Sequence, residues 1–246
     1  MQKFLKNALL IAALAASGAA SAATITFDGL AESANAPYLP AFVTQYDEFY
    51  QSGYSLLGYT TKVGAQVGVD LVGTIVDGTD VANTCSGLTC PTNNATNFYG
   101  ALNDGGLAVY RTNGTAFNMT SLDASFLATP GTAVPSTSAV LVAYAYSGNT
   151  LVFQQNFYLP GPAANGSYSF SSYAFDAINA AMLVTEVDIQ GFSCAVGTTS
   201  CVRSANKAQF ALDNINVTAV PEPSTWLLMG LGLAAVGAIA RRRRAV

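Results

Sequence analysis

Phe210-Ala211-Leu212-Asp213-Asn214-Ile215-Asn216-Val217 and Val67-Gly68-Val69-Asp70-Leu71-Val72-Gly73-Thr74 are the stretches that decide the fold class of this chain. In both stretches large apolar residues recur mainly at every second position, with small or polar residues between them. A period of two is typical of a strand with one buried face and one wet face. The second stretch predicts a strand over 67–76, and the first predicts one over 209–217.

Further short apolar segments lie between these two strands and on either side of them. They cover residues 25–27, 107–110, 139–146, 151–159, 168–175 and 183–192. Turn residues such as Asp77-Gly78 and Asn165-Gly166-Ser167 separate many of them. The pattern predicts a single all-β domain over residues 24–219, folded as an antiparallel, jelly-roll-like β-sandwich. We expect residues 32–61 to form long loops with one strand near 52–57, and residues 85–97 to form a polar excursion.

The charges of the chain limit what it can do. Histidine is absent, which removes the usual general base and every Ser-His-Asp or Cys-His arrangement. Residues 24–219 hold thirteen acidic side chains against four basic ones, an excess of nine negative charges. Nucleic-acid binding depends on clusters of Lys and Arg, so this balance argues against a nucleic-acid partner. We expect no enzymatic activity, because a hydrolase would have only carboxylate chemistry left.

Four cysteines stand in two closely spaced pairs, Cys85 with Cys90 and Cys194 with Cys201. In an oxidising compartment, disulfides between the neighbours in sequence are the easiest loops to close. A zinc site of four thiolates is the alternative, although these spacings are wider than those of usual zinc pairs.

The first residues are typical of a secretory signal peptide over residues 1–22. Lys3 and Lys6 precede an apolar run, and Ala20-Ser21-Ala22 supplies the small residues of a cleavage site. The mature chain would then begin near Thr24. An uncleaved membrane anchor is the alternative, but the apolar run is shorter than the ~20 residues that span a bilayer.

Residues 220–246 combine three features in order. Pro221-Glu222-Pro223 comes first, an uncharged segment follows over 226–240, and Arg241, Arg242, Arg243 and Arg244 close it. We expect the segment to form a single transmembrane helix, with the arginines on the cytoplasmic side. The prolines would hold the preceding residues extended, where a membrane-bound enzyme could read them.

This end of the chain resembles the PEP-CTERM sorting signal of Gram-negative bacteria that make exopolysaccharide. The resemblance implies that Pro221, Glu222 and Pro223 are recognition residues for the membrane protease-transferase exosortase. It also implies a precursor that meets the Sec translocon and signal peptidase, stays in the inner membrane until it is processed, and then reaches the cell surface or extracellular matrix. A plain tail anchor is the alternative.

The opening residues 25–30 and the closing residues 210–215 are similar to those of β-sandwich ectodomains common among such proteins. In many carbohydrate-binding jelly rolls, acidic side chains on the first and last strands hold a structural calcium ion. Asp28 and Asp213 occupy comparable places here. Because Asp also caps turns without an ion, a purely structural role is the alternative.

Two functions remain open. The first is a non-enzymatic surface or matrix protein associated with exopolysaccharide or biofilm, and the second is a carbohydrate-binding module with structural calcium. A sugar-stacking face could come from aromatic residues, although such residues in strands more often belong to the core. The aromatic candidates are Tyr144, Tyr146, Phe153, Phe157 and Tyr158. Asp47 with Glu48 and Glu186 with Asp188 are the pairs a glycoside hydrolase would need, or else they are solvated edges.

Overall fold

The computed structural model describes residues 21–30, 41–85, 87–129, 137–194, 201–203, 207–220, 230 and 232–233. The chain forms two compact units, Ala23–Val217 and the two ends, Met1–Ala22 with Thr218–Val246. Among the described residues, no helix has the length and apolar character needed to cross a membrane. The predicted signal peptide and the predicted helix over 226–240 lie almost wholly outside the described residues and stay predictions.

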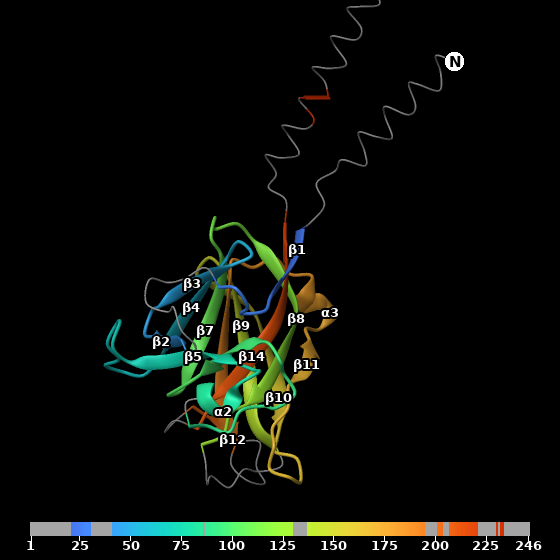
Figure 1. Cartoon of the computed structure of the whole chain (residues 1–246). Coiled ribbons are helices and arrows are strands. Elements are labelled where there is room, and N and C mark those ends of the chain that lie inside the picture. Colours follow the sequence, from blue (N-terminus) through green and yellow to red (C-terminus); the bar gives the residue numbers. More distant parts are fainter. Residues whose placement is uncertain are drawn as a thin grey trace, which may run out of the picture. The chain divides into compact units, whose positions relative to one another are not determined.

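Two seven-stranded sheets build the first unit (Figure 1). Sheet A has the strand order β11-β8-β14-β6-β5-β2, and β1 also pairs with β14. Its strands are β1 (Ser21–Ile25), β2 (Ala41–Thr44), β5 (Leu71–Asp77), β6 (Asn97–Ala101), β8 (Phe117–Phe126), β11 (Ser171–Ala174) and β14 (Phe210–Ala219).

Sheet B has the strand order β10-β9-β12-β7-β4-β3, with β13 added to the end of β12. Its strands are β3 (Glu48–Gln51), β4 (Tyr54–Thr60), β7 (Gly105–Arg111), β9 (Thr137–Ser147), β10 (Thr150–Pro160), β12 (Glu186–Cys194) and β13 (Cys201–Val202). The strand pairs whose register is described are antiparallel. The predicted all-β fold of two antiparallel sheets is therefore confirmed.

The core lies between the sheets, because one buried apolar cluster takes side chains from both of them. Tyr54 of sheet B meets Phe117 of sheet A edge to face, with ring centroids 5.3 Å apart. Phe49 of sheet B packs against Tyr99 of sheet A at 6.3 Å. These contacts tie the two layers together through large aromatic side chains, each of which buries a large apolar area.

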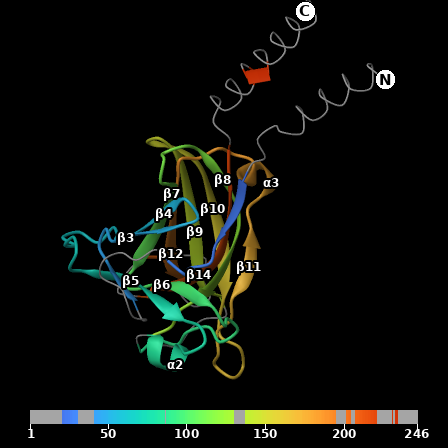
Figure 2. The ribbon, with the colours of Figure 1, turned by 45° about the horizontal axis from the view of Figure 1, so that its top comes forward.

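Part of the other side of sheet A is also buried. Successive residues of a strand point to opposite faces, so Ile75 and Tyr99 enter the main core while their neighbours Val76 and Phe98 enter a second, smaller cluster. The short helix α2 (Val81–Thr84) and the loop up to Cys90 supply the cover for this face. Figure 2 shows α2 beside β6 at one end of the unit.

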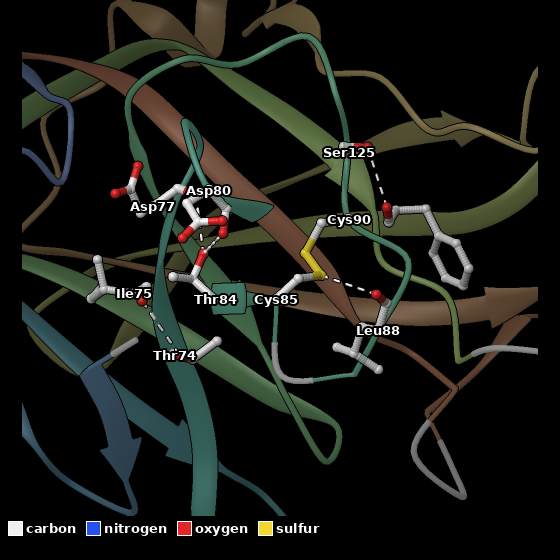
Figure 3. The surroundings of a disulfide bond; sticks show 10 residues. Thr74, Ile75, Asp77, Asp80, Thr84, Cys85, Leu88, Cys90 and Ser125 are labelled. Atoms are coloured by element: carbon white, nitrogen blue, oxygen red, sulfur yellow. Dashed lines mark hydrogen bonds between the residues drawn. A yellow bond between two sulfur atoms is a disulfide. The ribbon is translucent and has the colours of Figure 1, made fainter. Parts of the chain in front are cut away.

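Both predicted disulfides are confirmed. Cys85 pairs with Cys90 within the loop that covers sheet A, and Figure 3 shows this bond next to Thr84 and Leu88. Cys194 pairs with Cys201, which joins β12 to β13. No free cysteine is found in the described residues, so the thiolates that a zinc site would need are not there.

Several predicted boundaries were wrong. The strand predicted over 67–76 begins only at Leu71, because residues 67–69 form turns with Gly68 at φ 69°. The stretch 32–61, predicted as long loops with one strand near 52–57, contains three strands, β2, β3 and β4, of which β4 corresponds to the predicted one. The ten-residue strand β8 lies where no strand was predicted, since polar residues interrupt its apolar ones.

Gly105 stands where the chain crosses from sheet A to sheet B, and it provides a test of this packing. A Cβ atom added there would lie 1.9 Å from the backbone oxygen of Val72. We expect Gly105→Ala to lower the free energy of unfolding of the full chain by ~2–3 kcal/mol, because backbone cannot move aside cheaply. Gly100→Ala is the control, since the nearest atom to its Cβ would be the end of the Leu127 side chain at 3.2 Å, and the nearest backbone atom would be 3.7 Å away. Equal melting temperatures for the two variants in a circular-dichroism melt would contradict this packing.

Candidate functional site

The outward side of sheet B carries the largest group of polar and aromatic side chains described in the strands. Val187 and Ile189 of β12 enter the core, so Glu186, Asp188 and Gln190 point outward. The same alternation applies along the neighbouring strands. We call this surface the tyrosine face, and define it by Glu48, Tyr50, Tyr59, Tyr110, Tyr144, Tyr146, Tyr158, Glu186, Asp188 and Gln190.

The strand register places these side chains in rows that run across the sheet. Tyr50 is opposite Ser55, which is opposite Tyr110. Tyr110 is in turn opposite Glu186, and Glu186 is opposite Tyr146. Tyr110 and Tyr146 therefore flank Glu186 at two strand spacings, ~10 Å, from each other.

The next row holds two more carboxylates. Glu48 of β3 lies at one end, and Asp188 of β12 is opposite Tyr144 of β9. Tyr50 and Tyr158 have 44% and 63% of their surface exposed, while Tyr110, Tyr144 and Tyr146 are half-buried. The face thus offers aromatic rings to solvent with acidic groups between them.

Glu48 fixes two of the tyrosines. One of its oxygens accepts a hydrogen bond from the Tyr50 hydroxyl at 2.8 Å, and the other accepts from the hydroxyls of Ser55 and Tyr110. These bonds, that from Ser55 first, lower the pKa of Glu48, so the carboxylate stays ionised at neutral pH. Because the phenol groups are held at one end, their rings keep one orientation on the sheet.

Glu186 and Asp188 form the acidic centre of the face. Burial, followed by the charge of Glu186, raises the pKa of Asp188 to about 7. A hydrogen bond between the two carboxyls adds to this effect. Within the described part of the chain, neither carboxyl forms an ion pair.

Arg203 is the cation nearest to this centre, but its guanidinium is bonded to other groups. It donates from Nε to the backbone oxygen of Asp104 at 3.0 Å and from Nη1 to Oε1 of Gln190 at 2.7 Å. Gln190 in turn donates to the Tyr59 hydroxyl at 2.7 Å. Arg203 also lies over the Tyr59 ring, 6.0 Å from its centroid. Its role is to fix Gln190 and Tyr59 at the edge of the face.

The structure divides the aromatic residues singled out from the sequence. Tyr144, Tyr146 and Tyr158 lie on the outward face, whereas Phe157 is in the core and Phe153 packs against the core. Tyr50, Tyr59 and Tyr110 were missed. The alternation of β4 and β7 carries the signal that could have found Tyr59 and Tyr110.

The structure places both carboxyl pairs singled out from the sequence. Asp47 turns toward the backbone N–H and hydroxyl of Thr44, which donate to its Oδ2 at 2.7 Å. Glu186 and Asp188 lie side by side on the outward side of β12.

Asp28 and Asp213, the predicted calcium ligands, do meet around one segment. Asp28 accepts a hydrogen bond from the backbone N–H of Asn97 at 2.9 Å, while Asp213 accepts from Asn94 at 2.8 Å and from Thr96 at 3.2 Å. Asp213 is almost completely buried, and this burial raises its pKa to about 6, with a further contribution from Asp28.

The donors around Asp213 occupy the positions that an ion would need. The Asn94 side-chain oxygen accepts from the backbone N–H and hydroxyl of Thr96, which turns its NH₂ group, a non-ligating group, toward Asp213. The backbone N–H of Asn214 bonds to the other oxygen of Asp213 at 2.7 Å. No group of three or more acidic, Cys or His side chains suited to a metal occurs in the described residues. Calcium takes six to eight oxygens, so it could bind here only by displacing these donors, and the predicted calcium site at Asp28 and Asp213 is untested.

A calcium titration tests that hypothesis. Because Asp213 is already satisfied by protein donors, we expect millimolar calcium to leave the melting temperature of the full chain unchanged relative to chelator. An ion that binds the native state must raise it by mass action. A rise that is lost in Asp213→Asn would show that calcium displaces Asn94, and would restore the calcium site.

The Glu186 and Asp188 pair makes the stability of the domain depend on pH. The pKa of Asp188 is raised above its value in the unfolded chain, so this residue costs no stability below about pH 4 and costs more as pH rises through about 7. We expect Asp188→Asn to raise the melting temperature at pH 8 by ~2–4 °C, the effect of about 1 kcal/mol in a domain of this size, since partial exposure screens the charge. At pH 4 the two melting temperatures should coincide. A difference that does not change with pH would contradict the argument.

The tripartite C-terminal sequence defines the class of this chain, a protein with a C-terminal sorting signal. Residues 219–244 match the PEP-CTERM protein-sorting motif. This match identifies the chain as a protein that carries the PEP-CTERM sorting signal, as the sequence predicted. The motif implies processing by an exosortase and a precursor that passes through a membrane. Pro221, Glu222, Pro223 and the four arginines fall within the match but outside the described residues.

Comparison with characterised proteins finds no significant sequence match. Among solved structures, TmCBM61 in complex with beta-1,4-galactotriose is 7% identical with a TM-score of 0.33, over 69% of this chain and 90% of that chain. The CBM22-1-GH10 modules of Clostridium thermocellum xylanase 10B are 16% identical with a TM-score of 0.30, over 75% of this chain and 29% of that one. A cyclase from Fischerella sp. TAU is 11% identical with a TM-score of 0.41, over 82% and 99% of the two chains.

Proposed function

We propose that this protein is a non-enzymatic component of the cell surface or extracellular matrix, sorted through its C-terminal motif and associated with exopolysaccharide. The motif at residues 219–244 carries the proposal, because it follows a folded all-β domain. In this role, the precursor is held in the inner membrane until an exosortase processes it, and the domain then acts outside the cell.

A carbohydrate-binding role for the domain fits within this function, and the tyrosine face favours it. Aromatic rings present flat apolar surfaces against which the apolar side of a sugar ring can pack. The carboxyl and amide groups between the rings can bond to hydroxyl groups. Glu48 holds Tyr50 and Tyr110 in place before a ligand arrives, which lowers the ordering cost of binding.

The absence of enzymatic activity is part of the proposal. The chain has no histidine, and its paired carboxyls are bonded to each other or to hydroxyl groups of the sheet. Carboxylates that hold tyrosines in position serve binding and not bond cleavage.

Replacing Pro221, Glu222 and Pro223 with alanines tests the sorting step. We expect the domain to fold normally, because these residues follow β14, while an unprocessed precursor accumulates in the inner membrane. Mass spectrometry of the membrane and surface fractions measures the outcome. A control variant with serine at Ala245 and Val246, outside the matched residues, should be processed as usual. Surface protein that still ends in Arg244-Ala245-Val246 would contradict sorting by cleavage.

A further inference from the structure

The two sheets differ in what happens to their outward sides. Around Val76 and Phe98, the outward side of sheet A is covered by α2 and the loop closed by Cys85 and Cys90. The centre of the corresponding side of sheet B is not covered in this way, and this side exposes Tyr50 and Tyr158. Several aromatic rings left open to solvent on one face are typical of a binding surface.

The charges on this face select among ligands. Glu48, Glu186 and Asp188 contribute three carboxyl groups, and the single nearby guanidinium is bonded to Asp104 and Gln190. An anionic ligand would meet only repulsion here. A ligand with a positive group would find both carboxylates and the negative faces of tyrosine rings.

Resting on the proposed carbohydrate-binding role, we propose that the tyrosine face binds a polysaccharide whose sugars carry free amino groups. The rings of Tyr110 and Tyr146 pack against the sugars on either side of Glu186. One ammonium group donates hydrogen bonds to Glu186 and Asp188.

The surroundings of the acidic centre agree with this role. Tyr144 and Tyr146 of β9, Tyr110 of β7, and Tyr59 of β4 lie around the pair. Burial of two carboxyls side by side is unfavourable without a cation. The neighbouring carboxyls of Glu186 and Asp188 therefore destabilise the folded domain, and a bound ammonium group would reduce that effect.

A matched pair of ligands tests the inference on the full chain purified in mild detergent. Chitosan hexamer carries free amino groups, and chitin hexamer is the same backbone with those groups acetylated. We expect calorimetry to show the chitosan hexamer bound at least tenfold more tightly, about the contribution of one charge-assisted hydrogen bond. Oligogalacturonate, an anionic probe, should not bind.

Variants separate the tyrosine face from the general acidity of the domain. Asp188→Asn should remove most of the preference for chitosan while its raised melting temperature at pH 8 shows that it folds. Tyr146→Ala should weaken the binding of both hexamers. Asp176→Asn removes an exposed carboxylate outside the face, and Phe42→Ala removes an exposed ring outside it; both should bind as the unmodified chain does.

Each outcome decides the matter. Equal affinity for the two hexamers would overturn recognition of amino groups but leave the carbohydrate-binding role. The same holds if Asp188→Asn and Asp176→Asn lose the preference for the chitosan hexamer to the same extent. No binding to either hexamer would overturn both. Neither result bears on sorting, which the Pro-Glu-Pro variant tests separately.

Discussion

Each sheet of this sandwich has one side in the main core and one side that faces away from it. The structure depends on what covers or occupies that outward side. In sheet A, Val76 and Phe98 turn away from the main core and need a cover of their own. The chain supplies it between β5 and β6, where α2 and a disulfide-closed loop lie over them. The covering segment is short and packs against the sheet on one side only. The Cys85–Cys90 disulfide holds it in a compact form.

The outward side of sheet B has no such cover at its centre, and many of its residues there are polar. Val187 and Ile189 bury one side of β12, while Glu186 and Asp188 meet solvent on the other. Cross-strand neighbours then decide what each polar group does. Glu48 accepts hydrogen bonds from the hydroxyl groups of three side chains. Asp188 instead has the carboxyl of Glu186 beside it and Tyr144 opposite it. Glu48 therefore orders the tyrosines of the face, whereas Asp188 has no ion-pair partner among the described residues.

The sequence predicts the class of the fold, the disulfides and the C-terminal motif better than the strand boundaries. Period-two alternation revealed β12 and β14, and short spacing revealed both disulfides. The strand β8 was missed because polar residues interrupt its apolar ones, and one of them, Asn118, donates to the backbone oxygen of Met182 in the segment before β12. The tyrosine face could not be assembled from the sequence, because it depends on the order β3-β4-β7-β12-β9-β10, which places residues 48 and 188 on one surface.

A binding surface and a stable fold make opposing demands at Asp188. A partly buried carboxyl beside another carboxyl raises the free energy of the folded domain at neutral pH, whereas asparagine would fill the same space without the charge. Core packing does not require an acid there, since the residue points away from the core and its neighbours Val187 and Ile189 are already buried. On sheet A, by contrast, the segment closed by Cys85 and Cys90 buries the outward side chains of Val76 and Phe98. An exposed sheet with an unfavourable acid at its centre is consistent with a side chain kept for a ligand, and the fold bears that cost because the aromatic contacts between the sheets stabilise it elsewhere.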